Sequence, residues 1–164
     1  MSAVEDEQLD EQDVVTQEHL DTEQNLTFIM ADEEYGVDIL AVQEIRGWES
    51  ATPVPNSPCH IKGVINLRGT IVPIMDLRQR FGLPAIEYGD ETVVVVLKVK
   101  IGRNQRVMGI IVDAISDVYD VPTEKIKTTG LGDNINARFI RGLVSVEKGM
   151  VILLELEKLL TIED

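Results

Sequence analysis

The chain has 164 residues, of which 44% are hydrophobic, and a formal net charge of -14. This length and composition allow one packed domain or two small halves that share a core, whereas the charge argues against a nucleic-acid binder and against docking to an anionic membrane. A single cysteine excludes an intrachain disulfide, and the chain has neither a secretory signal nor an apolar run near the roughly 18 residues that span a bilayer. We therefore expect a cytoplasmic protein without direct membrane insertion.

Residues 1–24 form an acidic segment. They hold nine acidic residues and no Lys or Arg. Few of these side chains could be buried, so the composition predicts an acidic flexible tail, disordered or loosely helical, ahead of a domain that begins at residue 25. Such a tail either keeps the protein soluble or docks to a partner.

Short β-like runs broken by Gly, Pro and Asn follow the acidic segment. The first is LTFIM at residues 26–30. The stretch IKGVINLRGTIVPIMDLRQRF, residues 61–81, reads as two strands joined by a tight turn and followed by a short amphipathic helix. TVVVVLKVKI, residues 92–101, is β-branched over most of its length, which is typical of a strand buried on both faces.

The chain also repeats itself. YGVDILAVQEI at residues 35–45 aligns without a gap with MGIIVDAISDV at residues 108–118, and residues 61–81 align with IRGLVSVEKGMVILLELEKLL at residues 140–160. We predict two pseudo-repeats, about 25–88 and 89–162. Five short strands in each favour small barrels, since closure removes exposed edges, and two such barrels would share an apolar interface. The alternative is one β-sandwich with accidental self-similarity.

No residue pattern indicates catalysis. Cys59 and His60 are adjacent, and neighbouring side chains on an extended chain point apart, so they make a poor nucleophile and base. With His19 they are too few for a zinc site. Asp76 and Glu155 each precede a predicted short helix and suit its N-cap. We predict a binding module that is not an enzyme and that uses no cofactor or metal.

The predicted hairpin gives no structural reason for an arginine at residue 68. The predicted turn needs Gly69, but it does not need an arginine, and the second copy has Glu147 and Lys148 there. An arginine presents a planar fork of donors suited to carboxylates and interface pairs. It either meets a binding partner or pairs with Glu44 or Asp38 within the fold, and the two roles are compatible.

Together, several of these stretches resemble the CheW family of chemotaxis coupling proteins. The matching stretches are EEYGVDILAVQEIRGW (33–48), IKGVINLRGTIVPIMDLRQRF (61–81), TVVVVLKV (92–99), MGIIVDAISDVYDV (108–121) and GMVILLELEKLL (149–160). The resemblance covers residues 25–162. The acidic tail and the loop at residues 127–137 depart from the family pattern.

The resemblance implies an all-β fold of two intertwined five-stranded SH3-like β-barrels that share a hydrophobic core, with one or two short helices. It implies a non-catalytic adaptor that links the cytoplasmic tips of methyl-accepting chemoreceptors to the regulatory domain of the histidine kinase CheA, within membrane-bound receptor arrays, and that also associates with itself in rings. The alternative is an SH3-like binding scaffold of another two-component signalling pathway. Carried over by position, the receptor contacts fall in a groove between the halves, at Ile39, Val42, Glu44, Asn66 and Arg68.

Overall fold

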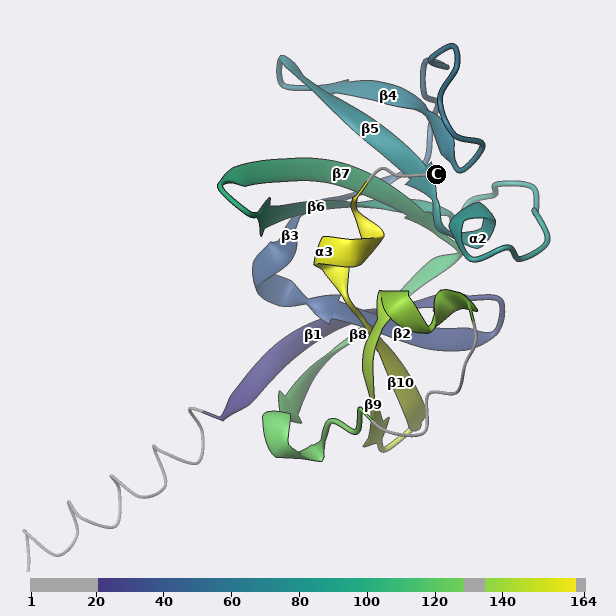
Figure 1. Cartoon of the computed structure of the whole chain (residues 1–164). Coiled ribbons are helices and arrows are strands. Elements are labelled where there is room, and N and C mark those ends of the chain that lie inside the picture. The colour runs from purple at the N-terminus through teal and green to yellow at the C-terminus, as the bar shows by residue number, and fades with distance from the viewer. Residues whose placement is uncertain (1–20, 129–134, 162–164) are drawn as a thin grey trace, which may run out of the picture.

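The structure, a computed structural model, describes residues 21–128 and 135–161 (Figure 1). The predicted acidic tail up to residue 20, and residues 129–134 of the loop at residues 127–137, lie outside the described residues. The strands within those ranges are β1 (Thr22–Met30), β2 (Glu33–Asp38), β3 (Val42–Gly47), β4 (Ile61–Leu67), β5 (Thr70–Asp76), β6 (Val93–Ile101), β7 (Asn104–Val112), β8 (Ala114–Pro122), β9 (Ile140–Val146) and β10 (Gly149–Leu154). The helical elements are η1 (Ile39–Ala41), α2 (Leu77–Arg80), η2 (Thr123–Lys125), η3 (Ile135–Phe139) and α3 (Leu156–Leu159).

These strands form two curled five-stranded sheets. Sheet A has the order β8-β1-β2-β10-β9 and lies in the lower part of Figure 1, whereas sheet B has the order β3-β6-β7-β5-β4 and lies above it. Strands β1–β5 come from the first pseudo-repeat and β6–β10 from the second, so each sheet mixes strands of both. The predicted fold class, all-β with intertwined halves and two short α-helices, is confirmed.

The exchange between the repeats is reciprocal. The last strand of each copy pairs in parallel with the second strand of the other copy, as β10 with β2 and β5 with β7. The first strand of each copy pairs antiparallel with the third strand of the other, as β1 with β8 and β3 with β6. The hydrophobic core of one half therefore cannot form without strands of the other.

Three apolar clusters fill this architecture. The largest draws residues from both sheets and from α2 and α3, and it includes Phe28, Val95 and Leu159. A second cluster belongs to sheet B and includes Val94 and Val96, while a third belongs to sheet A. Alternate residues of β6 thus enter the shared core and the interior of sheet B, which confirms that this valine run is buried on both faces.

In each sheet, an isolated β-bridge joins the segment that follows one edge strand to the other edge strand, and so brings the two edges together. The chain that follows β3 returns so that Thr52 pairs with Val64 of β4, with N–H···O distances of 2.9 and 2.8 Å. A Cβ on Gly63, which has φ +151°, would lie 2.2 Å from the Thr52 carbonyl oxygen. The equivalent bridge in sheet A joins Lys127 to Leu143 of β9. Glycine is therefore required at residue 63 by the close approach of the two backbones.

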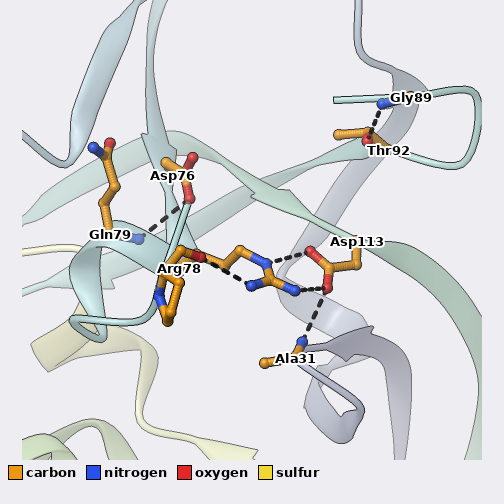
Figure 2. Close-up of polar contacts among 8 residues, drawn as sticks. Ala31, Asp76, Arg78, Gln79, Gly89, Thr92 and Asp113 are labelled. Carbon is orange, nitrogen blue, oxygen red and sulfur yellow. Dashed lines mark hydrogen bonds and ion pairs between the residues drawn. The ribbon is translucent and has the colours of Figure 1, made fainter. Parts of the chain in front are cut away.

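A partly buried ion pair connects α2 to the other half of the molecule (Figure 2). The Arg78 guanidinium donates to both carboxylate oxygens of Asp113, at 2.9 and 2.6 Å. Asp113 also accepts a 2.9 Å hydrogen bond from the amide of Ala31, in the β1–β2 turn. Burial raises the pKa of the Asp113 carboxyl, but the hydrogen bonds from Arg78 and Ala31 outweigh it, and the pKa lies below its usual value.

Three details differ from the sequence predictions. The composition predicts a tail through residue 24, but β1 begins at Thr22, because backbone pairing with β8 and an ion pair from Glu23 to Arg141 hold these polar residues in the sheet. Both α-helices are single turns. Asp76 is confirmed as an N-cap that accepts from the Gln79 amide, whereas Glu155 occupies the N-cap position without a side-chain hydrogen bond. None of the helices in the described ranges has the length and apolar character needed to cross a membrane.

Candidate protein-interaction site

The Arg68 turn is the starting point of the site. Arg68 and Gly69 are the two residues between β4 and β5, with φ values of 51° and 87°. Positive φ at both positions matches the type I′ hairpin turn, which favours Asn or Gly at the first position. The Asn66 side-chain oxygen accepts a 2.8 Å hydrogen bond from the Gly69 amide and so fastens the turn. The arginine therefore carries a backbone cost of about 1–2 kcal/mol, which points to a use for its side chain.

That side chain reaches across the open side of sheet B to strand β3. Its Nη1 atom lies 2.8 Å from Oε1 of Glu44, and the Arg46 guanidinium lies 3.9 Å from the same carboxylate. The Glu44 side chain is 20% exposed, whereas that of Arg68 is 74% exposed. Of the two internal partners considered from the sequence, the structure selects Glu44. Asp38 instead accepts a hydrogen bond from the Leu40 amide and caps η1.

A β-bulge separates the predicted contact residues on β3. Val42 lies opposite Leu97 of β6, but Glu44 lies opposite Val96, so the register shifts between them. Directly opposed residues share a face of the sheet. Val42 therefore packs with Leu97 against the shared core, whereas Glu44 faces the interior side of sheet B. On a regular strand, residues two apart would face the same way.

The junction between the two sheets carries the remaining predicted residue. Ile39, in η1, is half-buried and packs against the shared core, as Val42 does. Leu40 lies between them in the chain, and its side chain is 90% exposed. It lines a hollow of about 450 Å³ between the sheets, together with residues of β6 and α3. This hollow is a groove between the halves. Leu40 and Ala41 line it, whereas Ile39 and Val42 do not.

A second hollow of about 470 Å³ lies beside the Glu44–Arg68 pair, where the edges of sheet B approach each other. We call it the sheet B seam. Its lining residues are Arg46, Gly47, Trp48, Glu49, Ser50, Thr52, Val64, Ile65, Asn66 and Ile71. Ile71 is 60% exposed. Ile45 on the neighbouring β3 is 42% exposed, on the face opposite to that of Glu44. The seam therefore combines aliphatic surface with a charged pair at its margin, an arrangement that suits a protein partner.

Sheet A repeats this arrangement. Lys148 at the tip of the β9–β10 hairpin lies 3.7 Å from Asp117, the residue that aligns with Glu44. A hollow of about 420 Å³ lies at this sheet A seam and is lined by residues that include Lys127, Leu143 and Met150. Val118 and Met150 are exposed here, at the positions that align with Ile45 and Ile71. The molecule therefore presents two related surfaces, of which the sheet B seam has the shorter ion pair and the less exposed carboxylate.

Of the remaining candidate residues, His19 lies outside the described residues, and Cys59 and His60 differ in exposure. Cys59 is exposed, whereas His60, the next residue, is 6% exposed. Within residues 21–128 and 135–161, no three His, Cys, Asp or Glu side chains converge as a metal ion would require. The arrangement offers shape, apolar area and paired charges.

Sequence reasoning missed the exposed aliphatic residues Leu40, Ile45 and Ile71. Their exposure depends on η1, on the β3 bulge and on the curl of sheet B, none of which has a local signature. The alignment of the repeats contained one usable signal, because Ile45 and Ile71 match aliphatic residues at Val118 and Met150. An apolar residue kept at a strand position in both copies is, however, more often a core residue.

Comparisons with known proteins agree with this geometry. The family model described as CheW-like domain matches residues 24–164. A chemotaxis protein CheW from Klebsiella aerogenes is 44% identical over 140 residues, which is 85% of this chain and 82% of that protein. A chemotaxis protein CheW from Rhizobium meliloti is 39% identical over 140 residues, covering 85% and 88%. The crystal structure of the scaffolding protein TtCheW from Thermoanaerobacter tengcongensis superimposes with a TM-score of 0.76 at 30% identity, over 86% of this chain and 89% of that one.

Proposed function

The chain belongs to the family of CheW-like domains, and we propose that it is a chemotaxis coupling protein. In this role it links the cytoplasmic tips of methyl-accepting chemoreceptors to the histidine kinase CheA, and receptors control kinase autophosphorylation through it. The protein works as a non-catalytic adaptor in the cytoplasm, at membrane-bound receptor arrays. The observation that carries the proposal is the Arg68 turn, where an arginine is kept at a strained position and held against Glu44 at the edge of an aliphatic seam.

The receptor surface that we propose runs from η1 to the hairpin tip of sheet B. A receptor tip is a bundle of helices with apolar ridges between charged rows. Leu40 supplies exposed aliphatic area, and Glu44 and Arg68 supply charges that would fix the register. Ile39 and Val42 support this surface from beneath, since both pack against the shared core. Asn66 contributes indirectly, because its side-chain oxygen accepts a hydrogen bond from the Gly69 amide and so stabilises the turn that positions Arg68.

The two related seams suit an adaptor with more than one partner. An adaptor in an array must hold a receptor and at least one kinase domain or second adaptor at the same time. Sheet A presents aliphatic and charged residues at positions that match those of sheet B, on a different part of the molecule. We assign kinase binding and self-association in rings to the sheet A seam, which lies outside the receptor surface. Each contact is expected to be weak and to gain strength from multivalency in the array.

The test is reconstitution of kinase control. Receptor signalling fragments, CheA, ATP and this protein are mixed, and kinase autophosphorylation is followed with the wild type and Arg68→Ala. We expect strong activation by the wild type and its loss with Arg68→Ala. Receptor-fragment binding is measured separately by calorimetry, and Lys148→Ala is its matched control: it removes the cation of the related pair in sheet A, at the seam assigned to the kinase, and should leave receptor binding unchanged.

The outcomes separate the function from the site. Activation that persists with Arg68→Ala keeps the coupling function but removes Arg68 from the receptor contact. Absence of activation by the wild type, with receptor and kinase fragments known to be competent, would contradict the coupling function. The fold would then serve another two-component signalling pathway as a scaffold.

A further inference from the structure

A cluster of cationic side chains lies away from the surfaces considered so far, beside the C-terminal ends of α2 and α3. Arg80, Arg138, Phe139, Lys158 and Thr161 surround a hollow of about 330 Å³, which we call the cation pocket. It brings together the end of the first pseudo-repeat, the segment before β9, and the last helix. In Figure 1, α2 and α3 lie on the same side of the molecule, between the two sheets. The pocket has no place in the proposed coupling contacts.

Two guanidinium groups in this pocket flank one aromatic ring. The guanidinium carbons of Arg80 and Arg138 lie 4.7 and 4.5 Å from the centroid of Phe139, which is only 2% exposed. Arg80 also donates to the carbonyl of Thr161, at 3.5 Å. Burial lowers the pKa of Arg80, and the charge of Arg138 lowers it further. Cation–π contacts with one ring, and the Thr161 carbonyl that Arg80 contacts, therefore hold two like charges close together.

Nearby carboxylates do not neutralise the outer cations of the pocket. Arg138 and Lys158 are both exposed, and none of the described carboxylates lies within ion-pair distance of either. The pocket therefore concentrates positive charge on a protein whose net charge is -14.

We propose that the cation pocket binds an acidic peptide segment, and that its occupant is the chain's own N-terminal region, residues 1–20. That region carries seven acidic residues and no Lys or Arg. Six of the seven fall within residues 5–13, namely Glu5, Asp6, Glu7, Asp10, Glu11 and Asp13. This is the densest block of one charge sign in the chain, and the cation pocket is its complement.

The place where the acidic segment joins the fold supports this choice. Glu23, the last acidic residue of the segment, already pairs with Arg141 of β9 at 2.6 Å. Glu23 also lines the hollow between the sheets together with Glu157 of α3, and the next residue of that helix is Lys158 of the cation pocket. The hollow that Glu23 lines and the cation pocket therefore share the single-turn helix α3. An extended chain of 20 residues reaches up to about 66 Å.

Tethering makes such docking effective although each charge pair is weak. A segment that is covalently joined to the domain presents its acidic residues at about millimolar effective concentration. The docking should also depend strongly on salt, because the Debye length falls from about 30 Å at 0.01 M to about 3 Å at 1 M. When docked, the acidic segment covers the face formed by α2 and α3 and excludes other acidic segments from it.

Paramagnetic relaxation in the full-length protein tests the docking. The only cysteine is removed by Cys59→Ser, and a nitroxide is attached through Gln8→Cys. At low salt we expect loss of amide signal at residues 80, 138, 158 and 161, with recovery at high salt. The double variant Arg138→Gln, Lys158→Gln should restore these signals, whereas Arg103→Gln, at the exposed β6–β7 turn, should not.

Three results would overturn the proposal. One is the absence of signal loss around the pocket at low salt. Another is signal loss that the double variant leaves unchanged. The third is signal loss that appears only with Glu163→Gln and Asp164→Asn, because the C-terminal acidic residues would then hold the pocket in the natural chain. The measurement uses neither receptor nor kinase, so its outcome is independent of the coupling function.

Discussion

Replacing Arg68 separates a structural role from an interface role. Arg68→Ala keeps a Cβ and therefore keeps the backbone cost of the turn, so the measured change reflects the lost side chain. The pair with Glu44 is short, at 2.8 Å, but the Arg68 side chain is 74% exposed. Solvent screening limits such pairs to about 0.2–1 kcal/mol. We therefore expect Arg68→Ala to lower the free energy of unfolding by less than about 1 kcal/mol.

A double-mutant cycle with Glu44→Gln, followed by urea denaturation, measures this coupling directly. The same variants are then tested for receptor-fragment binding. A loss of about tenfold or more in affinity, equivalent to about 1.4 kcal/mol, would exceed the stability change and assign Arg68 to the interface. A coupling energy above about 2 kcal/mol, with receptor affinity unchanged in the folded variant, would refute this reasoning and leave Arg68 as a structural residue.

Three further predictions follow from the packing and the charges. Gly63→Ala should lower the free energy of unfolding by at least about 2 kcal/mol, since its Cβ would meet the Thr52 carbonyl at 2.2 Å, whereas Gly89→Ala, with nothing within 4 Å, should change it little in the same urea titration. Burial raises the pKa of Asp113, but its hydrogen bonds lower the pKa more. The stabilising contribution of Asp113 is therefore complete above the unfolded-state pKa of about 3.9 and is lost as the pH falls through the lower folded-state pKa. Asp113→Asn should therefore make the free energy of unfolding depend less steeply on pH in this acidic range. Leu40→Asp, at a residue 90% exposed, should leave stability within about 0.5 kcal/mol while weakening receptor-fragment binding by calorimetry, and unchanged binding would remove η1 from the receptor surface.

The sequence alone was sufficient for the local elements and for the repeat. Alternating and β-branched runs predicted strands because side-chain period is a local property, and the valine run of β6 is buried on both faces as expected. Two blocks that each align without a gap between the copies predicted the repeat and five strands in each copy. Asp76 was recognisable as an N-cap because an N-cap uses only residues close to it in the chain. The boundary at residue 24 was misplaced because the start of β1 is polar and depends on its pairing with β8.

Strand exchange could not be derived from composition or spacing. Parallel pairing of β10 with β2, and of β5 with β7, joins segments far apart in the chain. A strand's own sequence states which of its faces are apolar, but it does not state which neighbour supplies the backbone hydrogen bonds. The intertwined arrangement was expected only from the family resemblance, and the tertiary structure shows how it arises.

The candidate site divides in the same way. The sequence marked Arg68 as unnecessary for the turn and left Glu44 and Asp38 as equal partners. Tertiary structure chose Glu44, because the curl of sheet B brings the hairpin tip over β3, while Asp38 is occupied in capping η1. The β3 bulge turned Val42 into the shared core and Glu44 away from it. The type of each residue and the periodicity of apolar residues can be taken from the sequence. The pairing of Arg68 with Glu44 and the exposure of Leu40 depend on long-range packing.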